Sequence, residues 1–382
     1  MKAIKFLLLF ACLLSACSVN VSSVSPTPTL PGPPTTPSLS LTPTLLAPIP
    51  TSSPSPVAPF MVPITWEKLQ LTGKLVLAAG PGGVVQLDLT SGQMTTLFQL
   101  PDPQNSWVQS EWASPDTAQI VIAYAPPPPP GGIQFGYTNL YLLPTDGSVE
   151  PLPLFLNLKP NEAYFNPVWS PDGKYIYVLH LVPPPSQTEQ PTYAIERLAY
   201  PPNQPYPEKE LVVENAFWPR LSPDGAKLAY VAWDVTKPPN ELFIADADGK
   251  NATQIPLPDT FAAVDAPFFS PDGHYLIFSV INNTGFAQRS WLDRVLEVQT
   301  AYADGSPADW WRVPVAGGEP EQLTRIFDTS LYGVFSPDGQ HIVYVSGSGV
   351  SVMNADGTGV TSLLTPDRIP GMAGASTVNW IP

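Results

Sequence analysis

The sequence predicts an all-β fold, a six-bladed β-propeller, from a turn that occurs five times and from the β-rich stretch after each copy. The turns are 114–117, 170–173, 222–225, 270–273 and 336–339, and their serines are 56, 52, 48 and 66 residues apart. The β-rich stretches that follow are 119–124, 175–179, 227–232, 275–280 and 341–346. A period of this size, with several strands in each unit, is typical of a propeller.

The first segment, residues 1–16, has the pattern of a secretory signal peptide. Lys2 and Lys5 precede an apolar stretch, 6–14, that is too short to span a membrane comfortably. The following Leu-Ser-Ala-Cys resembles the lipobox of bacterial lipoproteins, which implies a diacylglyceryl group on Cys17 and cleavage before it. An ordinary secretory peptide with an incidental cysteine is the alternative. We therefore expect a place in the bacterial cell envelope, lipid-anchored and outside the cytoplasmic membrane.

Residues 17–66 are predicted to form a disordered stalk rich in proline, serine and threonine. The segment holds 13 prolines between Pro26 and Pro63, and no charged residue lies between Val19 and Trp66. Such a composition cannot bury a core and stays extended. At ~3.1 Å per residue, as in polyproline II, the stalk could reach on the order of 100 Å. It would hold the third segment, 67–382, away from a membrane that the protein touches only through its lipid.

The repeated turn has the residues that a tight connection between antiparallel strands requires. Serine can bond the backbone ahead, proline presets φ, aspartate bonds local amides, and glycine accepts a positive φ. The aspartates could form a row of acidic site residues, but each has a nearer partner in its own turn. We predict purely structural roles for Asp116, Asp172, Asp224, Asp272 and Asp338.

The second half of four units carries a further pattern, seen at 140–147, 241–249, 310–318 and 350–357 as a strand that ends in Asp-Gly or Gly-Gly. Together with the Ser-Pro-Asp-Gly turns, these residues resemble the WD40-like, TolB-type (PD40) propeller repeats of bacterial envelope proteins over roughly 68–382. The resemblance implies the fold, but not the function, because propellers have many unrelated activities.

The two ends of the repeat region are predicted to share one blade. Strands at 75–79, 84–89 and 94–100 have no Ser-Pro-Asp-Gly turn before them, and 375–382 resembles an innermost strand with nothing after it. Trp380 aligns with Trp169, the residue before the second turn. Pairing of the last strand with the first three would complete a ring of six blades, and no segment is left for a seventh. Closure also removes open sheet edges.

The loops between the second and third strands of the blades share one face of a propeller, and three of them are long: 125–137, 181–209 and 281–309. Long loops in compact domains are usually functional or disordered, and aromatic and arginine residues form binding hot spots. The alternative is that these side chains pack the loops onto the propeller. The candidate binding residues are Phe135, Tyr137, Tyr193, Arg197, Tyr200, Tyr206, Phe286, Arg289, Trp291 and Arg294.

Composition and motifs argue against several functions. The formal net charge of −15 argues against nucleic acid and anionic lipid as partners. The chain has three histidines, of which only His180 is expected near the loop face, and one cysteine would remain after cleavage, so a zinc site is not expected. Gly-x-Ser-x-Gly and the phosphate-binding Gly-x-x-x-x-Gly-Lys are absent. We predict no catalysis, no metal and no cofactor, although a carboxylate-pair glycosidase stays open.

The leading hypothesis is therefore a monomeric envelope lipoprotein whose propeller binds an unidentified protein or peptide as a scaffold or assembly factor. The alternative is a propeller that binds or processes glycans. Aromatic residues and carboxylates in the central funnel would support this alternative. A structural lipoprotein with no small ligand is a third possibility.

Overall fold

The computed structural model describes residues 58–128, 137–155, 162–184, 189, 191–202, 208–232, 241–282, 306–368 and 377–382. The signal peptide, Cys17 and most of the expected stalk lie outside this part of the chain. The described residues form six antiparallel sheets and two short 3-10 helices, η2 (Glu67–Leu69) and η3 (Pro366–Arg368). None of their helices is long and apolar enough to cross a membrane.

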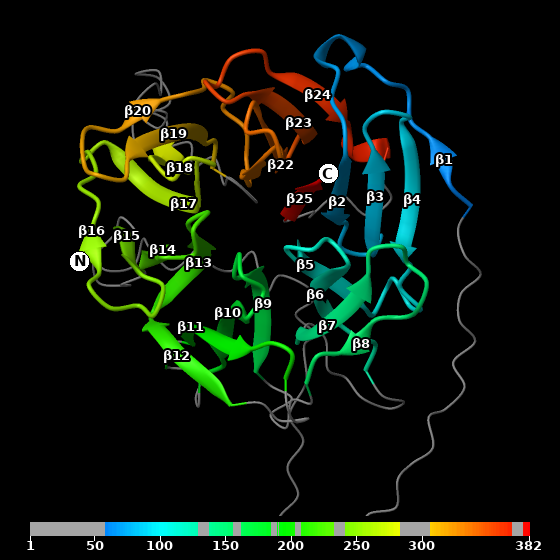
Figure 1. Cartoon of the computed structure of the whole chain (residues 1–382), viewed down its shortest axis with the longest axis horizontal. Coiled ribbons are helices and arrows are strands. Elements are labelled where there is room, and N and C mark those ends of the chain that lie inside the picture. Colours follow the sequence, from blue (N-terminus) through cyan, green and yellow to red (C-terminus); the bar gives the residue numbers. More distant parts are fainter. Residues whose placement is uncertain are drawn as a thin grey trace, which may run out of the picture. The chain divides into compact units, whose positions relative to one another are not determined.

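Five sheets follow the repeat units, and Figure 1 shows them arranged as blades around a common centre. Blade 1 contains β5 (Trp107–Ala113), β6 (Gln119–Ala125), β7 (Asn139–Pro144) and β8 (Leu152–Pro153). Blade 2 contains β9 (Ala163–Trp169), β10 (Tyr175–Val182), β11 (Thr192–Ala199) and β12 (Lys209–Glu214). Blade 3 contains β13 (Ala216–Leu221), β14 (Lys227–Ala232), β15 (Glu241–Asp246) and β16 (Thr253–Gln254). Blade 4 contains β17 (Phe261–Phe269), β18 (Tyr275–Asn282), β19 (Asp309–Pro314) and β20 (Glu321–Gln322). Blade 5 contains β21 (Tyr332–Phe335), β22 (His341–Ser346), β23 (Gly349–Asn354) and β24 (Thr361–Leu364).

The sixth blade is built from both ends of the domain, as predicted. Its strand order is β1-β4-β3-β2-β25, with β1 (Phe60–Met61), β2 (Lys74–Ala78), β3 (Val84–Asp88), β4 (Gln93–Phe98) and β25 (Thr377–Ile381). Leu75 pairs with Trp380, and the Trp380 indole N–H donates to the carbonyl of Thr72 at 2.9 Å. The first strands of blades 1 to 5, together with β25, contact one another in sequence around a full circle. The six-bladed, closed propeller is thus confirmed.

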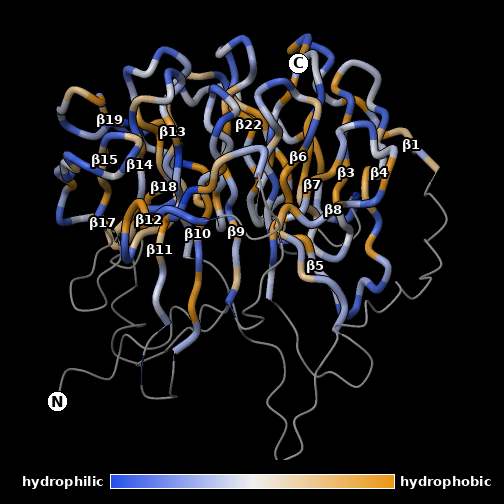
Figure 2. Tube along the Cα trace, turned by 60° about the horizontal axis from the view of Figure 1, so that its bottom comes forward, coloured by the Kyte–Doolittle hydropathy of each residue, from blue (hydrophilic) through white to orange (hydrophobic). Residues whose placement is uncertain are grey.

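The core lies between neighbouring blades, where apolar faces of adjacent sheets pack on each other. Figure 2 shows hydrophobic residues along the strands and hydrophilic residues at many of the turns. Part of the predicted stalk belongs to this core. Trp66, which the sequence analysis placed in the stalk, is 1% exposed and donates its indole N–H to the carbonyl of Leu89 at 2.8 Å.

All five repeated turns use the same hydrogen bonds. The serine hydroxyl donates to the aspartate two residues later at 2.5–2.7 Å and accepts the N–H of the first residue of the next strand. The aspartate also accepts the N–H of the residue two positions further on. The serine hydrogen bond is the main cause that lowers the aspartate pKa, at Asp172 to about 2. Each carboxylate therefore has local partners within its own turn.

Candidate functional site

The described residues include four of the ten candidate binding residues on the predicted loop face. Six candidates, and the lipidation site Cys17, lie outside the described residues: Phe135, Tyr206, Phe286, Arg289, Trp291 and Arg294. The four that are described are Tyr137, Tyr193, Arg197 and Tyr200. Of these, Tyr137 is half-buried just before β7, in the expected connection.

Blade 2 departs from the predicted loop. Residues 192–199 form β11, so Tyr193 and Arg197 lie in a strand. Tyr200 lies at the opposite end of the blade from the expected face, because its N–H donates to the carbonyl of Lys174 beside the repeated turn. In the sequence this strand lies between two proline-rich segments, and it was predicted to be part of the same loop. The apolar residues Tyr193 and Ile195, two positions apart, are the signal for the strand, and both side chains are buried.

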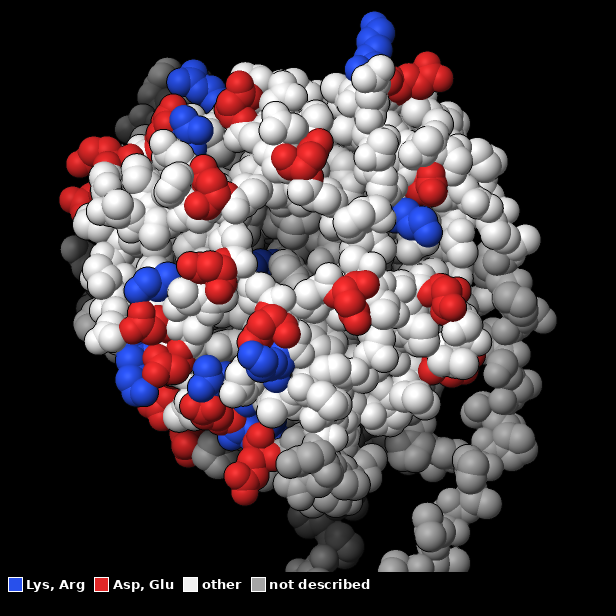
Figure 3. Space-filling model, in the orientation of Figure 1, with Lys and Arg blue, Asp and Glu red and all other residues white. Residues whose placement is uncertain are grey.

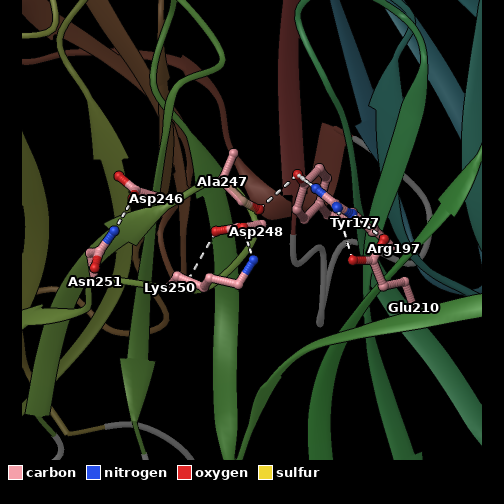
Figure 4. Close-up of polar contacts among 8 residues, drawn as sticks. All are labelled: Tyr177, Arg197, Glu210, Asp246, Ala247, Asp248, Lys250 and Asn251. Carbon is pink, nitrogen blue, oxygen red and sulfur yellow. Dashed lines mark hydrogen bonds and ion pairs between the residues drawn. The ribbon is translucent and has the colours of Figure 1, made fainter.

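Arg197 has its hydrogen-bond partners within blade 2. Its guanidinium donates to both carboxylate oxygens of Glu210 at 2.9 Å and to the Tyr177 hydroxyl at 3.2 Å. The Tyr177 hydroxyl in turn donates to the carbonyl of Ala247, in the β15–β16 turn of blade 3 (Figure 4). Asp248 and Lys250 form an ion pair in the same turn. An arginine with a bidentate carboxylate partner and a third hydrogen-bond partner has few N–H donors left for a ligand.

His180 also has two partners within its blade. Its Nε2 lies 2.8 Å from Glu162 and its Nδ1 lies 2.9 Å from Glu196, while its ring stacks on Tyr164 with centroids 4.4 Å apart. The imidazole lines a pocket of about 290 Å³ near the β10–β11 connection. Both ring nitrogens are used by carboxylates of the same blade, so His180 has no nitrogen free to bind a metal. The described residues contain no group of three ligands that could hold a metal ion.

A different set of residues gathers where the six innermost strands meet, and we call it the axis cluster. Figure 3 shows that one face of the ring is hollowed at its centre, with atoms of a basic side chain visible inside. The strands β5, β9, β13, β17, β21 and β25 line this centre. The axis cluster consists of Glu111, Trp112, Asn166, Trp218, Arg220, Asp265, Tyr332 and Asn379.

Arg220 lies across the ring. It comes from blade 3, yet its guanidinium carbon is 4.4 Å from the ring centre of Trp112 in blade 1 and 4.5 Å from that of Tyr332 in blade 5. The residue is only 3% exposed, and burial lowers its pKa, but a guanidinium keeps its charge in proteins. It donates to the Pro219 carbonyl at 3.3 Å, whereas its Nε has no hydrogen-bond partner among the described residues.

Glu111 is fully buried beside Trp112. It is the acidic residue whose charge, when ionised, raises the pKa of Arg220. Its Oε2 accepts a hydrogen bond from the Asn379 amide at 3.0 Å, while its Oε1 has no partner in the part of the chain that is described. Burial raises the pKa of Glu111 to about 8, so that the acid is mostly neutral at pH 7. The positive charge of Arg220 is therefore not balanced by Glu111 at neutral pH.

Asp265 adds a second carboxyl group with a raised pKa. Burial raises this pKa to about 7, although the Ala266 N–H donates to the carboxylate at 3.1 Å and acts in the other direction. Trp218 in turn lies 5.8 Å from Tyr332, measured between ring centres. Two carboxyl groups and one guanidinium thus share the centre of the ring with three large aromatic side chains.

Three of the innermost strands are bent next to this cluster. Asn166, Trp218 and Ala266 have φ values of 50°, 55° and 45°, and each precedes a proline at a point where the strand pairing shifts in register. Left-handed backbone is uncommon for residues other than glycine, and it costs free energy at a bulky residue such as tryptophan. Such bulges often re-aim side chains near functional sites. Asn166 Oδ1, at one of these bulges, is another buried atom without a partner among the described residues.

The axis cluster was missed by the sequence analysis, although a signal was present. Glu111, Arg220 and Asp265 are charged residues in strands that are otherwise uncharged, two to five positions before the serine of a repeated turn. This position places the cluster nearer to the turns than to the loops between second and third strands.

Comparison with known proteins supports the fold and does not identify a function. No protein-family model matches the sequence, and no curated protein matches it. Among solved structures, a chain of a nidogen/laminin complex has 11% identity and a TM-score of 0.53, covering 77% of this chain and 94% of that chain. A putative TolB from Agrobacterium tumefaciens has 18% identity and a TM-score of 0.49, covering 81% and 98%. An oligogalacturonate lyase in complex with manganese has 13% identity and a TM-score of 0.46, covering 74% and 70%. At these identities the likeness concerns the fold alone, and this fold is that of the β-propellers.

Proposed function

We propose that the protein is a lipid-anchored lipoprotein of the bacterial cell envelope whose propeller binds a protein or peptide partner without catalysis. One observation carries this proposal: charged groups are buried at the centre of the ring with polar atoms that have no partner among the described residues. Glu111 Oε1, Asn166 Oδ1 and Arg220 Nε are such atoms, and they come from three different blades. Leaving buried polar atoms unpaired costs free energy. Such atoms are therefore expected where a bound ligand supplies their hydrogen-bond partners.

The anchor and the stalk support the same role. A lipid at Cys17 and a proline-rich segment after it would hold the propeller at a distance from the membrane, where a partner can reach it. The face in Figure 3 carries scattered acidic and basic side chains around the hollow and is uncharged over most of its area. Such a surface suits contact with another protein better than contact with nucleic acid, which requires a basic patch.

A capture experiment tests this function. The full chain, with an affinity tag, is cross-linked in its host cells and purified, beside an Arg220→Met variant and an Arg197→Met variant. We expect the wild type to capture a discrete protein, Arg220→Met to capture little, and Arg197→Met to capture as much as the wild type. Arg197 is the matched control, because it is a half-buried arginine that stacks on Tyr175 and lies in a strand outside the axis cluster.

Two further results of this experiment are informative. Undiminished capture by a folded Arg220→Met variant would remove the axis cluster from the binding site. A third variant, in which residues 283–305 are replaced by a short Gly/Ser linker, tests the predicted loop face, since four of the candidate residues lie there. Loss of capture with that variant would extend the site to the loop face.

Glycan binding is the second candidate function. The three aromatic side chains and two carboxyl groups of the axis cluster are the combination expected of a glycan site. However, Arg220 lies against the rings of Trp112 and Tyr332, which leaves less of their faces for a sugar. Binding to a glycan array, together with no captured protein, would favour this candidate.

A further inference from the structure

We propose that the axis cluster is a carboxylate-binding site, in which the edge of the Arg220 guanidinium takes a carboxylate group of the ligand. This inference rests on the proposed function and names the chemistry of the ligand at that site. The carboxylate could belong to the C-terminus of a peptide or to an acidic sugar, and the experiment below separates these two sources.

The geometry of Arg220 decides which part of it can bind. Aromatic rings lie 4.4 and 4.5 Å from the guanidinium carbon, Trp112 from blade 1 and Tyr332 from blade 5. Contacts from two other blades hold the planar group in one place within the ring. A guanidinium presents its N–H donors in its own plane, and a carboxylate fits that edge with two parallel hydrogen bonds. The Nε–H, which has no partner among the described residues, belongs to this edge.

The charge of the cluster favours a monoanion. Of the titratable groups in the axis cluster, Glu111 from β5 and Tyr332 from β21 act on the charge of Arg220, whereas Asp265 from β17 does not. Burial raises the pKa of Glu111 and Tyr332, so both are mostly neutral at pH 7, and the guanidinium stays without a counter-ion. One carboxylate would balance the single positive charge, whereas a phosphate dianion would leave an unbalanced negative charge in a buried site.

Glu111 has a second role in this scheme. As a neutral acid it carries a proton, and its Oε1 has no acceptor or donor in the described part of the chain. The protonated carboxyl can therefore donate a hydrogen bond to the same ligand that Arg220 holds. Above its pKa the group is instead a carboxylate. Its negative charge then neutralises the positive charge of Arg220 and repels a second anion. Binding should then weaken as the pH rises past about 8.

The test is a titration of the full chain, in detergent, with N-acetylglycine, N-acetylglycinamide and glucuronate, followed by ligand-observed NMR. N-acetylglycine represents a peptide C-terminus, the amide is its neutral counterpart, and glucuronate represents an acidic sugar. At pH 6.5 we expect one of the acids to bind at least tenfold more tightly than the amide. The acid that binds identifies the source of the carboxylate.

Variants distinguish ligand binding from a structural role of Arg220. Arg220→Met should lose at least tenfold in affinity for the acid. The affinity of Arg220→Lys should lie between those of the wild type and Arg220→Met, because lysine keeps the charge but not the planar edge. Arg312→Met is the matched control: Arg312 also lies over a tyrosine, Tyr275, but outside the axis cluster, and its replacement should change nothing. Glu111→Gln should bind like the wild type at pH 6.5 and keep its affinity at pH 9, where the wild type weakens about tenfold.

Equal affinity for acid and amide, or full acid binding by a folded Arg220→Met variant, would overturn the inference. So would the lack of any detectable acid binding. These outcomes are separate from failure of the proposed function. If the protein captures its partner through Arg220 but binds no acid, the proposed function stands and the carboxylate-binding site does not. If it binds the acid but captures no partner, the carboxylate-binding site stands and the proposed function does not.

Discussion

Replacing Glu111 with glutamine is expected to raise the free energy of unfolding at pH 8 by about 4 kcal/mol, and by only about 1 kcal/mol at pH 5.5. In the folded protein, burial raises the pKa of this acid from 4.5 to about 8. Between those values the unfolded chain ionises the side chain freely and the folded chain does not. The folded state binds more protons there, so its stability falls as the pH rises from 4.5 to 8 and then levels off. Glutamine resembles the neutral acid in shape and has no such cost.

Urea unfolding at the two pH values measures this effect. Glu321→Gln is the matched control, because Glu321 is an exposed acid paired with an arginine, and its replacement should change stability by less than ~1 kcal/mol at either pH. If Glu111→Gln were no more stable than the wild type at pH 8, Glu111 would be the ionised counter-ion of Arg220. The positive charge of Arg220 on the axis would then be balanced.

Deleting residues 377–382 is expected to abolish the cooperative unfolding transition of the domain. The removed strand buries Val378, Trp380 and Ile381, each less than 10% exposed. Burial of such a side chain contributes ~1.5–3 kcal/mol, so three contribute on the order of 5–9 kcal/mol. This is comparable to the whole stability of many domains. The deletion also leaves β2 without its inner neighbour and opens the ring.

Thermal melting followed by circular dichroism tests this prediction. Removal of Pro382 alone, which is exposed and lies after the last strand, should leave the melting temperature unchanged. An unchanged melting temperature after removal of all six residues would mean that the domain does not depend on closure by β25.

The fold could be predicted from the sequence because its determinants are local. Each Ser-Pro-Asp turn carries its own hydrogen bonds, and the alignment of Trp380 with Trp169 already indicated a last strand that completes a blade. Blade 2 was the exception. The strand that holds Tyr193 and Arg197 lies between proline-rich segments, and its charged residues, Glu196 and Arg197, interrupt the apolar alternation.

The candidate site could not be predicted in the same way, because it depends on closure of the ring. Arg220 contacts Trp112 and Tyr332, which are more than a hundred residues away on either side in the sequence. Only the circular arrangement brings these side chains together and buries the charge. The sequence predicts a binding face on long loops that carry aromatic and arginine residues, whereas the cluster lies in the innermost strands that line the centre.

We propose that the partner is bound at the axis of the propeller. Site-specific photo-cross-linking tests it most directly, with a benzoylphenylalanine in place of Trp112 in the axis cluster or of Phe327, which is 64% exposed in the β20–β21 connection. After irradiation of host cells, we expect a discrete cross-linked protein or peptide from position 112 and none from position 327. Cross-links from position 327 alone, with the Trp112 variant folded, would contradict the account.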